Sequence, residues 1–167
     1  GIAEANAIGI AAGLALSGFV PVVASFGSFI TGKNIEIRTS IAFNNAPVII
    51  VGTHGGLIGP DGPTQAGLQD IAVMRSMPLM SVVQPSSAIE LRSALKFYIK
   101  KKRPVYFRIT REHCREFFNK SYVFNEGQIS LIIKKTRRIL VLTSGPLLQR
   151  CFDAIKNINQ KEIGLGN

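Results

Sequence analysis

Residues 46–84 read APVIIVGTHGGLIGPDGPTQAGLQDIAVMRSMPLMSVVQ, and this stretch decides the fold of the chain. Four successive β-branched residues at 48–51 predict a buried strand, because strands covered on both faces are apolar without alternation. The elements expected here, in order, are a strand at 46–54, a glycine- and proline-rich loop at 54–67, a helix at 67–77 and a strand at 79–84. This order predicts parallel strands joined by a helical crossover.

The same alternation continues on both sides of this stretch. The further elements expected are a helix at 3–17, a strand at 20–25, a helix at 28–45, a helix at 85–102 and a strand at 104–110. In the helix at 85–102, Ser87 and Glu90 have the spacing of a capping box. Alternating strands and helices indicate an α/β domain, a parallel sheet with helices on both faces.

A second domain is expected to begin late in the sequence. Residues 111–128 have no clear period, and they are followed by a new strand, helix and strand expected at 129–145, 146–160 and 162–167. This unit is too short to bury a core, and no strand precedes the first helix, so the sequence looks like an internal slice of a larger enzyme. We expect a domain over 1–118, its front portion missing, and a linker plus an incomplete second α/β domain over 119–167.

The first thirty residues and the two cysteines bear on membrane insertion and on the cellular compartment, and they favour a protein without a membrane span. The charge-free run over 5–30 is long enough to cross a bilayer, but Gly18 and Pro21 interrupt it, and broken backbone is costly in lipid. No signal peptide is visible. Cys114 and Cys151 have no metal-type partners and no disulfide framework. We therefore expect a cytoplasmic protein without a membrane segment or a metal site of its own.

The net charge of +10 raises the possibility of nucleic-acid binding. The basic residues concentrate at 96–108 and 132–138, where they border apolar strands, and no helix-turn-helix, zinc-finger or RNP-type motif accompanies them. Charge alone provides only non-specific attraction. The sequence therefore favours a solvated basic face, and we expect no nucleic-acid partner.

Polar and aromatic residues of unusual type follow the predicted strands. Ligands of parallel α/β sheets bind at the carboxyl ends of strands. Residues at these ends, with the acid that begins the first helix, are Glu4, Phe26, Phe29, His54, Asp61, Gln65, Arg108 and Arg111. Each also has a structural interpretation: a helix-end charge for Glu4, a core position for Phe26, a turn for Asp61. Together they predict one pocket with an acid, aromatic faces and two arginines.

The order and density of several segments resemble the pyrimidine-binding domain of the transketolase family of thiamine diphosphate enzymes, over about residues 1–118. The segments are GIAEANAIGIAAGLALSG (1–18), SFGSFITG (25–32), IRTSIAF (37–43), GTHGG (52–56) and DGPTQAGLQDIAVMRSMP (61–78). The resemblance is closest to the C-terminal section of transketolase or to one chain of a split transketolase. It implies thiamine diphosphate as cofactor and ketol transfer between sugar phosphates.

The resemblance also implies roles for individual residues. Glu4 matches the glutamate that hydrogen-bonds the aminopyrimidine ring and promotes proton transfer there, and Phe29, with Phe26, matches the aromatic positions that stack on this ring. A proton-sharing carboxyl needs a raised pKa, and we expect desolvation by alanine- and glycine-rich packing to supply it. His54 and Arg111 would hold phosphate or hydroxyl groups, since arginine donates two hydrogen bonds at once.

Two further positions belong to the same implied substrate site. Asp61 would bind a sugar hydroxyl. Gln65 stands where many transketolases have histidine, and an amide can orient a hydroxyl but cannot shuttle a proton. The proton-transfer role of that position is therefore not expected here.

Other parts of the family pattern are absent from this sequence. No GDG motif with a downstream asparagine is present, so Mg²⁺ and the cofactor diphosphate are expected on a diphosphate-binding domain elsewhere. We therefore expect a homodimer or a hetero-oligomer with a diphosphate-binding subunit, and no activity from this chain alone.

Two alternative functions stay open. The loop GLIGPDGPTQAG (56–67) resembles that of 1-deoxyxylulose-5-phosphate synthase, although that enzyme typically has arginine at the position of His54. A non-catalytic regulatory or assembly subunit with the same fold is the alternative from another class. The presence of Glu4, Phe29 and Asp61 favours a catalytic origin.

Overall fold

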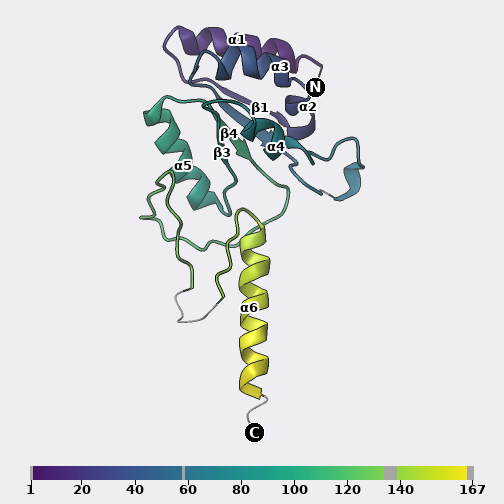
Figure 1. Cartoon of the computed structure of the whole chain (residues 1–167), viewed down its shortest axis with the longest axis vertical. Coiled ribbons are helices and arrows are strands. Elements are labelled where there is room, and N and C mark those ends of the chain that lie inside the picture. Colours follow the sequence, from purple (N-terminus) through teal and green to yellow (C-terminus); the bar gives the residue numbers. More distant parts are fainter. Residues whose placement is uncertain (1, 58, 134–138, 165–167) are drawn as a thin grey trace.

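The computed structural model describes residues 2–57, 59–133 and 139–164. Four parallel strands form a sheet in the order β1-β2-β4-β3 (Figure 1). Their bounds are Val22–Phe26 for β1, Ile49–Thr53 for β2, Ser81–Val83 for β3 and Val105–Arg108 for β4. The register pairs Phe26 with Thr53, and Gly52 with Arg108. The carboxyl ends of β1, β2 and β4 therefore lie along one edge of the sheet.

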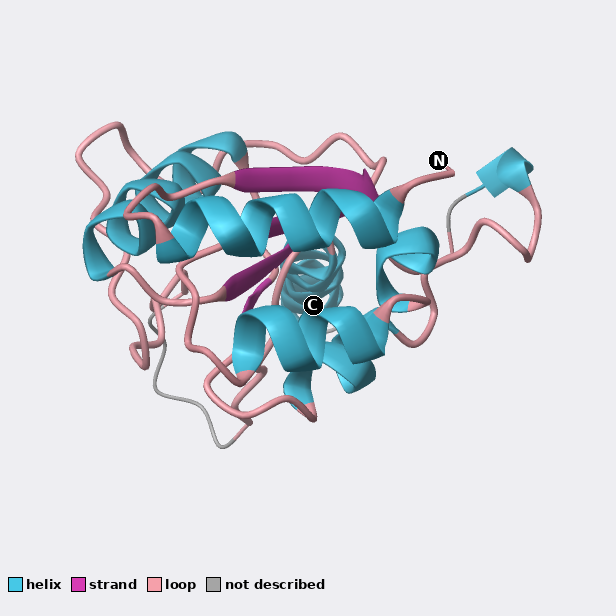
Figure 2. Ribbon diagram, turned by 90° about the horizontal axis from the view of Figure 1, so that it is seen from above, coloured by secondary structure: helices cyan, strands magenta, loops and turns pink. Residues whose placement is uncertain are grey.

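Helical segments connect and follow these strands (Figure 2). They are α1 (Glu4–Leu16), α2 (Gly27–Thr31), α3 (Asn34–Glu36), the π-helix η1 (Ile37–Ala42), the 3₁₀ turn η2 (Gly59–Asp61), α4 (Asp70–Arg75), α5 (Ala88–Lys101) and α6 (Leu147–Gly164). No helix in the part of the chain that the structure describes is long and apolar enough to cross a bilayer.

The sheet separates two apolar clusters. On one face, Ile8 of α1, Ile41 of η1 and Met74 of α4 pack in the cluster that includes Ile50 and Tyr106 of the strands. On the other face, the cluster combines Ala94 and Tyr98 of α5 with Ile49, Val105 and Phe107. Burying each large apolar side chain contributes about 1.5–3 kcal/mol. The predicted parallel sheet with helices on both faces is confirmed.

The single helix expected at 28–45 is instead three short segments. α2 ends at Thr31, and Gly32 and Lys33 separate it from α3. Glycine has low helix propensity, and the Thr31 hydroxyl donates to the Gly27 carbonyl at 2.7 Å, a bond that competes for helical backbone acceptors. The last segment widens to a π-helix, with the Phe43 amide donating to the Arg38 carbonyl at 2.8 Å.

The C-terminal part differs more from expectation. The strand predicted at 129–145 is not formed in the described residues 129–133 and 139–145, and 134–138 lie outside the described residues. The helix predicted at 146–160 is confirmed as α6, but α6 continues to Gly164, where a second strand was expected. Residues 165–167 lie outside the described part. A strand requires neighbours to satisfy its backbone groups, and the described residues provide none for these segments.

The start of α5 follows the predicted capping box only in part. The Ser87 hydroxyl accepts from the Glu90 amide at 3.4 Å, as predicted. The Glu90 carboxylate, however, accepts from the amide and the hydroxyl of Ser86, both at 2.7 Å, rather than from Ser87. The reciprocal bond is displaced by one residue because the Ser86 hydroxyl provides a second donor to the charged carboxylate.

Candidate functional site

Glu4 is the first residue of α1, and only 8% of it is exposed. The Ser25 hydroxyl, near the end of β1, donates to Glu4 Oε1 at 3.3 Å. The carboxylate therefore lies against the carboxyl end of the sheet, beside the residues that the sequence placed with it. The structure confirms the small-residue setting, since Ile8, Ala11 and Ala12 are buried along the same helix.

The electrostatics of Glu4 correct one expectation. Its pKa lies below the ordinary value of 4.5, because hydrogen bonds that Glu4 accepts in this chain favour the carboxylate. Desolvation raises the pKa but is outweighed, and the Ser25 hydroxyl lowers it further. The predicted upward shift is therefore wrong for this chain on its own, because packing against alanine and glycine on one side does not remove the donors around the acid.

Three rings stack where β1 and β2 end. Phe26 ends β1, and its ring lies parallel to that of Phe29 in α2, with centroids 5.3 Å apart and planes 7° apart. The His54 ring stacks on Phe26 at 3.8 Å and 18°. His54 Nδ1 is 3.0 Å from the Thr53 hydroxyl, which in turn donates to the Ser25 carbonyl at 3.3 Å.

These contacts join residues from three segments into one group. Glu4 contacts Ser25, Ser25 contacts Thr53, and Thr53 contacts His54, whose ring continues the stack. Ser25 was not among the residues predicted from the sequence. Its position near the carboxyl end of β1 was the signal that could have identified it.

The loop after β2 carries the other predicted residues. Arg111 Nη1 donates to Asp61 Oδ2 at 2.6 Å, and both side chains are partly exposed, 54% and 32% respectively. The backbone carbonyl of Gln65 accepts a hydrogen bond from the Ser28 hydroxyl at 3.0 Å, and this bond connects the end of the loop to α2. The Asp61–Arg111 pair thus forms a second group, joined to the first through the loop that contains His54 and Gln65.

A buried ion pair lies beneath this loop. Asp70, the first residue of α4, has no exposed surface, and its Oδ2 accepts from Arg108 Nε and from the Tyr106 hydroxyl, each at 2.9 Å. Burial and the charge of Asp70 raise the pKa of Tyr106. Arg108 was predicted at a strand end, but Asp70 was not predicted as a site residue, because within residues 67–77 it is one polar position of an amphipathic helix.

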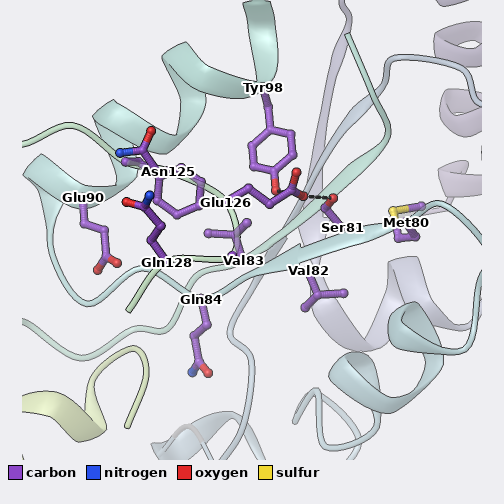
Figure 3. Close-up of a pocket in the computed structure, with 12 residues that line it drawn as sticks. Met80, Ser81, Val82, Val83, Gln84, Glu90, Tyr98, Asn125, Glu126 and Gln128 are labelled. Atoms are coloured by element: carbon purple, nitrogen blue, oxygen red, sulfur yellow. Dashed lines mark hydrogen bonds between the residues drawn. The ribbon is translucent and has the colours of Figure 1, made fainter. Parts of the chain in front are cut away.

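The structure also has an open hollow of about 450 Å³ alongside β3, which is the outermost strand on the side of the sheet opposite β1. Figure 3 shows Glu126, Tyr98 and Ser81 around it, with Glu90 and Gln84 nearby. None of the cofactor- or substrate-site residues predicted from the sequence lines this hollow. Among the described residues, no three His, Cys, Asp or Glu side chains cluster as a metal site would require.

Comparison with known proteins adds independent information. Residues 1–116 match the family described as "Transketolase, pyrimidine binding domain". The chain is 32% identical to an apulose-4-phosphate transketolase subunit of Actinobacillus succinogenes, over 98% of the chain and 53% of that protein. It is 29% identical to the 1-deoxy-D-xylulose-5-phosphate synthase of Clostridium botulinum, over 98% of the chain and 26% of that protein.

A solved structure shares the fold. It is described as a split gene transketolase, an inactive β4 tetramer, and it superposes with a TM-score of 0.73 at 33% identity, covering 80% of this chain and 43% of the other. The chain thus spans about half the length of the apulose-4-phosphate transketolase relative and about a quarter of the synthase that it matches.

Proposed function

The chain belongs to the transketolase family of thiamine diphosphate-dependent enzymes, and from this we propose that it forms the pyrimidine side of a transketolase site that passes a two-carbon ketol unit between sugar phosphates. The observation that carries the proposal is the group of Glu4, Ser25 and the Phe26–Phe29 stack at one edge of the sheet. This group combines an acid with aromatic faces, the chemistry that a protonatable aromatic ring requires.

The residues present fit the pyrimidine half of thiamine diphosphate. Glu4 would hold a proton at a ring nitrogen, and Phe29, supported by Phe26, would present a flat apolar surface to the ring. When bound, the cofactor supplies a nucleophilic carbon that carries the two-carbon unit. The GDG motif and the Mg²⁺ that it would hold belong, in this proposal, to a diphosphate-binding domain outside the chain.

Substrate binding falls to the loop after β2 and to the end of β4. Arg111 has the fork geometry for a phosphate, and Asp61 accepts hydrogen bonds from hydroxyl groups. His54, oriented by the Thr53 hydroxyl and by Phe26, contributes a third polar group. A site built to bind hydroxyls discriminates against substrates that lack them, which favours a ketose over pyruvate as donor.

A partner is required to complete this site. The outward face of α1 is apolar and uncovered in the isolated chain: Ile10, Leu14 and Leu16 are 56%, 43% and 64% exposed. A Cβ atom added at Gly9 or Gly13 would have no other atom within 4 Å, so the chain leaves open space beside both glycines. We propose that a diphosphate-binding subunit, or that domain of a second protomer, covers this face. By covering this face, the partner would remove water from around Glu4 and so raise the pKa of its carboxyl group.

A second candidate function is 1-deoxyxylulose-5-phosphate synthesis, favoured by the synthase relatives and by the loop GLIGPDGPTQAG. The two reactions are separated by supplying the chain, a diphosphate-binding subunit, thiamine diphosphate and Mg²⁺ with either donor. Conversion of xylulose 5-phosphate and ribose 5-phosphate is expected. Carbon dioxide release from pyruvate and glyceraldehyde 3-phosphate, without ketose cleavage, would support the synthase instead.

The non-catalytic alternative is tested in the same assay. Binding of the chain to the diphosphate-binding subunit without turnover of either donor pair would identify an assembly role. Turnover by the purified chain in the absence of a partner would contradict the proposal that half of the cofactor site is supplied from outside.

A further inference from the structure

Asp70 is a fully buried carboxylate outside the group of residues proposed to touch cofactor or substrate. Acidic residues are almost never fully buried unless paired. Its Oδ2 is bonded to Arg108 and Tyr106, whereas Oδ1 is buried without a hydrogen-bond partner among the described residues. A buried ion pair is often replaceable by apolar packing at no cost in stability. The presence of this pair therefore calls for a role other than holding the core together.

Arg108 connects this carboxylate to the loop over 54–67. While Nε donates to Asp70, Nη2 donates to the Gly67 carbonyl at 3.3 Å. A Cβ on Gly55 would lie 2.6 Å from Arg108 Nε, and one on Gly56 would lie 3.1 Å from Nη2. The backbone at both ends of the loop thus rests directly on the guanidinium group.

The two ends of the loop are also bonded to each other at this point. The Gly56 amide donates to the Gly67 carbonyl at 3.0 Å, the acceptor that Arg108 also uses, and the Gly67 amide donates to the His54 carbonyl at 3.4 Å. His54 itself has a φ of 56°, a left-handed conformation that a non-glycine residue keeps only when its surroundings hold it. Arg108 thus places a positive charge at the junction of the two loop ends.

Tyr106 provides an internal contrast. Its hydroxyl donates to the same Asp70 oxygen, but it packs against Gly52 and Gly27 rather than against the loop. Removal of this hydroxyl would weaken the surroundings of Asp70 and leave the contact between Arg108 and Gly67 in place.

We propose that Asp70 is a positioning residue that acts through Arg108: it aims the guanidinium group at Gly67 and so holds the loop that carries His54 and Asp61 in its substrate-binding conformation. The loop's role toward substrate rests on the proposed function, whereas the mechanical link does not. The two parts are tested separately.

The first test is amide hydrogen exchange of the full chain, which needs no cofactor. Arg108→Lys keeps a positive charge beside Asp70, but an ammonium group cannot donate in fixed directions to Asp70 and Gly67 together. We expect several-fold faster exchange at the Gly56 and Gly67 amides, with the thermal midpoint little changed. Asp70→Asn is expected to raise the same exchange rates, with a lower thermal midpoint because it leaves the buried charge of Arg108 without its partner. Tyr106→Phe, the matched control, is expected to leave loop exchange at the wild-type rate.

Unchanged loop exchange in both Arg108→Lys and Asp70→Asn overturns the proposal. If only one variant folds, that variant decides. If neither folds, the pair is needed for the core itself, and the positioning role is also overturned.

The second test uses the chain assembled with its diphosphate-binding subunit. Arg108→Lys is expected to raise KM for the ketose phosphate several-fold, with kcat and the thiamine diphosphate requirement little changed, because the loop faces substrate. A fall in kcat at constant KM would indicate a loss of folded protein and contradict positioning. If the wild-type assembly has no turnover, the proposed function fails, while the exchange result still decides whether Asp70 and Arg108 hold the loop.

Discussion

Arg111 Nη1 lies 2.6 Å from Asp61 Oδ2, so two side chains proposed to bind one substrate neutralise each other in the chain on its own. The residues come from different segments, the loop after β2 and the end of β4, and the contact bridges fifty positions of sequence. A phosphate that binds Arg111 must compete with this carboxylate. The pair is therefore expected to matter for substrate affinity more than for folding.

Asp61→Ala and Arg111→Ala are each expected to change the free energy of unfolding by less than about 1 kcal/mol, because partly exposed ion pairs contribute little. In the assembled enzyme, Asp61→Ala should raise KM for the ketose and lower kcat/KM. Arg111→Ala should penalise phosphorylated substrates more than free sugars. Urea unfolding and steady-state kinetics measure the two effects. Equal losses on free and phosphorylated sugars would exclude phosphate binding by Arg111.

Glu4→Gln is expected to leave cofactor binding largely intact and to lower kcat by about 10²–10⁴-fold, the usual contribution of acid–base catalysis. The measurement is hydrogen–deuterium exchange at C2 of the bound cofactor, with kcat of the assembly. Ser25→Ala is the control, because it removes only the 3.3 Å bond to the same carboxylate. An unchanged C2 exchange rate in Glu4→Gln would reduce Glu4 to a helix-end charge.

Two glycine substitutions should have opposite effects on the stability of the isolated chain. A Cβ on Gly52 of β2 would collide with the Tyr106 hydroxyl, so Gly52→Ala should destabilise by about 1–3 kcal/mol or more. Gly9→Ala in α1 meets open space and should stabilise by about 0.5–1 kcal/mol, since alanine favours helix. Urea unfolding of both variants checks the difference. A destabilised Gly9→Ala chain would mean that α1 packs differently.

Leu14→Glu tests the proposed partner surface. Leu14 is 43% exposed on α1, so the charge should leave the isolated chain folded and prevent association with the diphosphate-binding subunit. Sedimentation of the mixture measures complex formation. Ile99→Glu on α5, where the side chain is 51% exposed, is the matched control and should still associate. Association of Leu14→Glu at the wild-type level would place the partner elsewhere.

The hydroxyls of Ser81 and Tyr98 donate to Glu126 Oε1 at 2.7 and 2.8 Å, a cluster visible in Figure 3. The Ser81 hydrogen bond, outweighing desolvation, holds the pKa of Glu126 below its ordinary 4.5, and burial raises the pKa of Tyr98 to about 12.

Because the pKa of Glu126 is lowered on folding, its carboxylate stabilises the fold at pH values above the ordinary pKa of 4.5. This stabilisation is lost as the pH falls below 4.5. A raised phenol pKa stabilises the fold below 10, and this stability is lost as pH rises from 10 toward 12. Unfolding free energies measured across this range should fall at both ends, and Glu126→Gln should flatten the acid side. An acid side as steep as that of the wild type in Glu126→Gln would mean that other carboxyls control it.

Patterns local to a few residues were sufficient for most of the fold. The β-branched run before Gly52 and the helix stopped near Pro78 depend on neighbours in sequence, so strand and helix positions were predictable, as was the gathering of Phe26 and His54 at strand ends. The helix break at Gly32 and the absence of a strand in the described residues of 129–145 were not predictable from sequence. Both features depend on whether the local preference of a segment for helix or strand agrees with the hydrogen-bonding partners that the folded chain brings near it.

Sequence by itself determined the family and the candidate residues, because the residues proposed as catalytic acid and stacking rings occupy characteristic positions along the chain. Only the tertiary structure decided how they are held. Asp70 and Arg108 are 38 positions apart, and nothing in either segment indicates that one neutralises the other beneath the loop. The pKa of Glu4 likewise depends on which donors surround it after folding, and its predicted direction was wrong for that reason. Burial and pairing of charges are properties of three-dimensional proximity, which local sequence patterns do not encode.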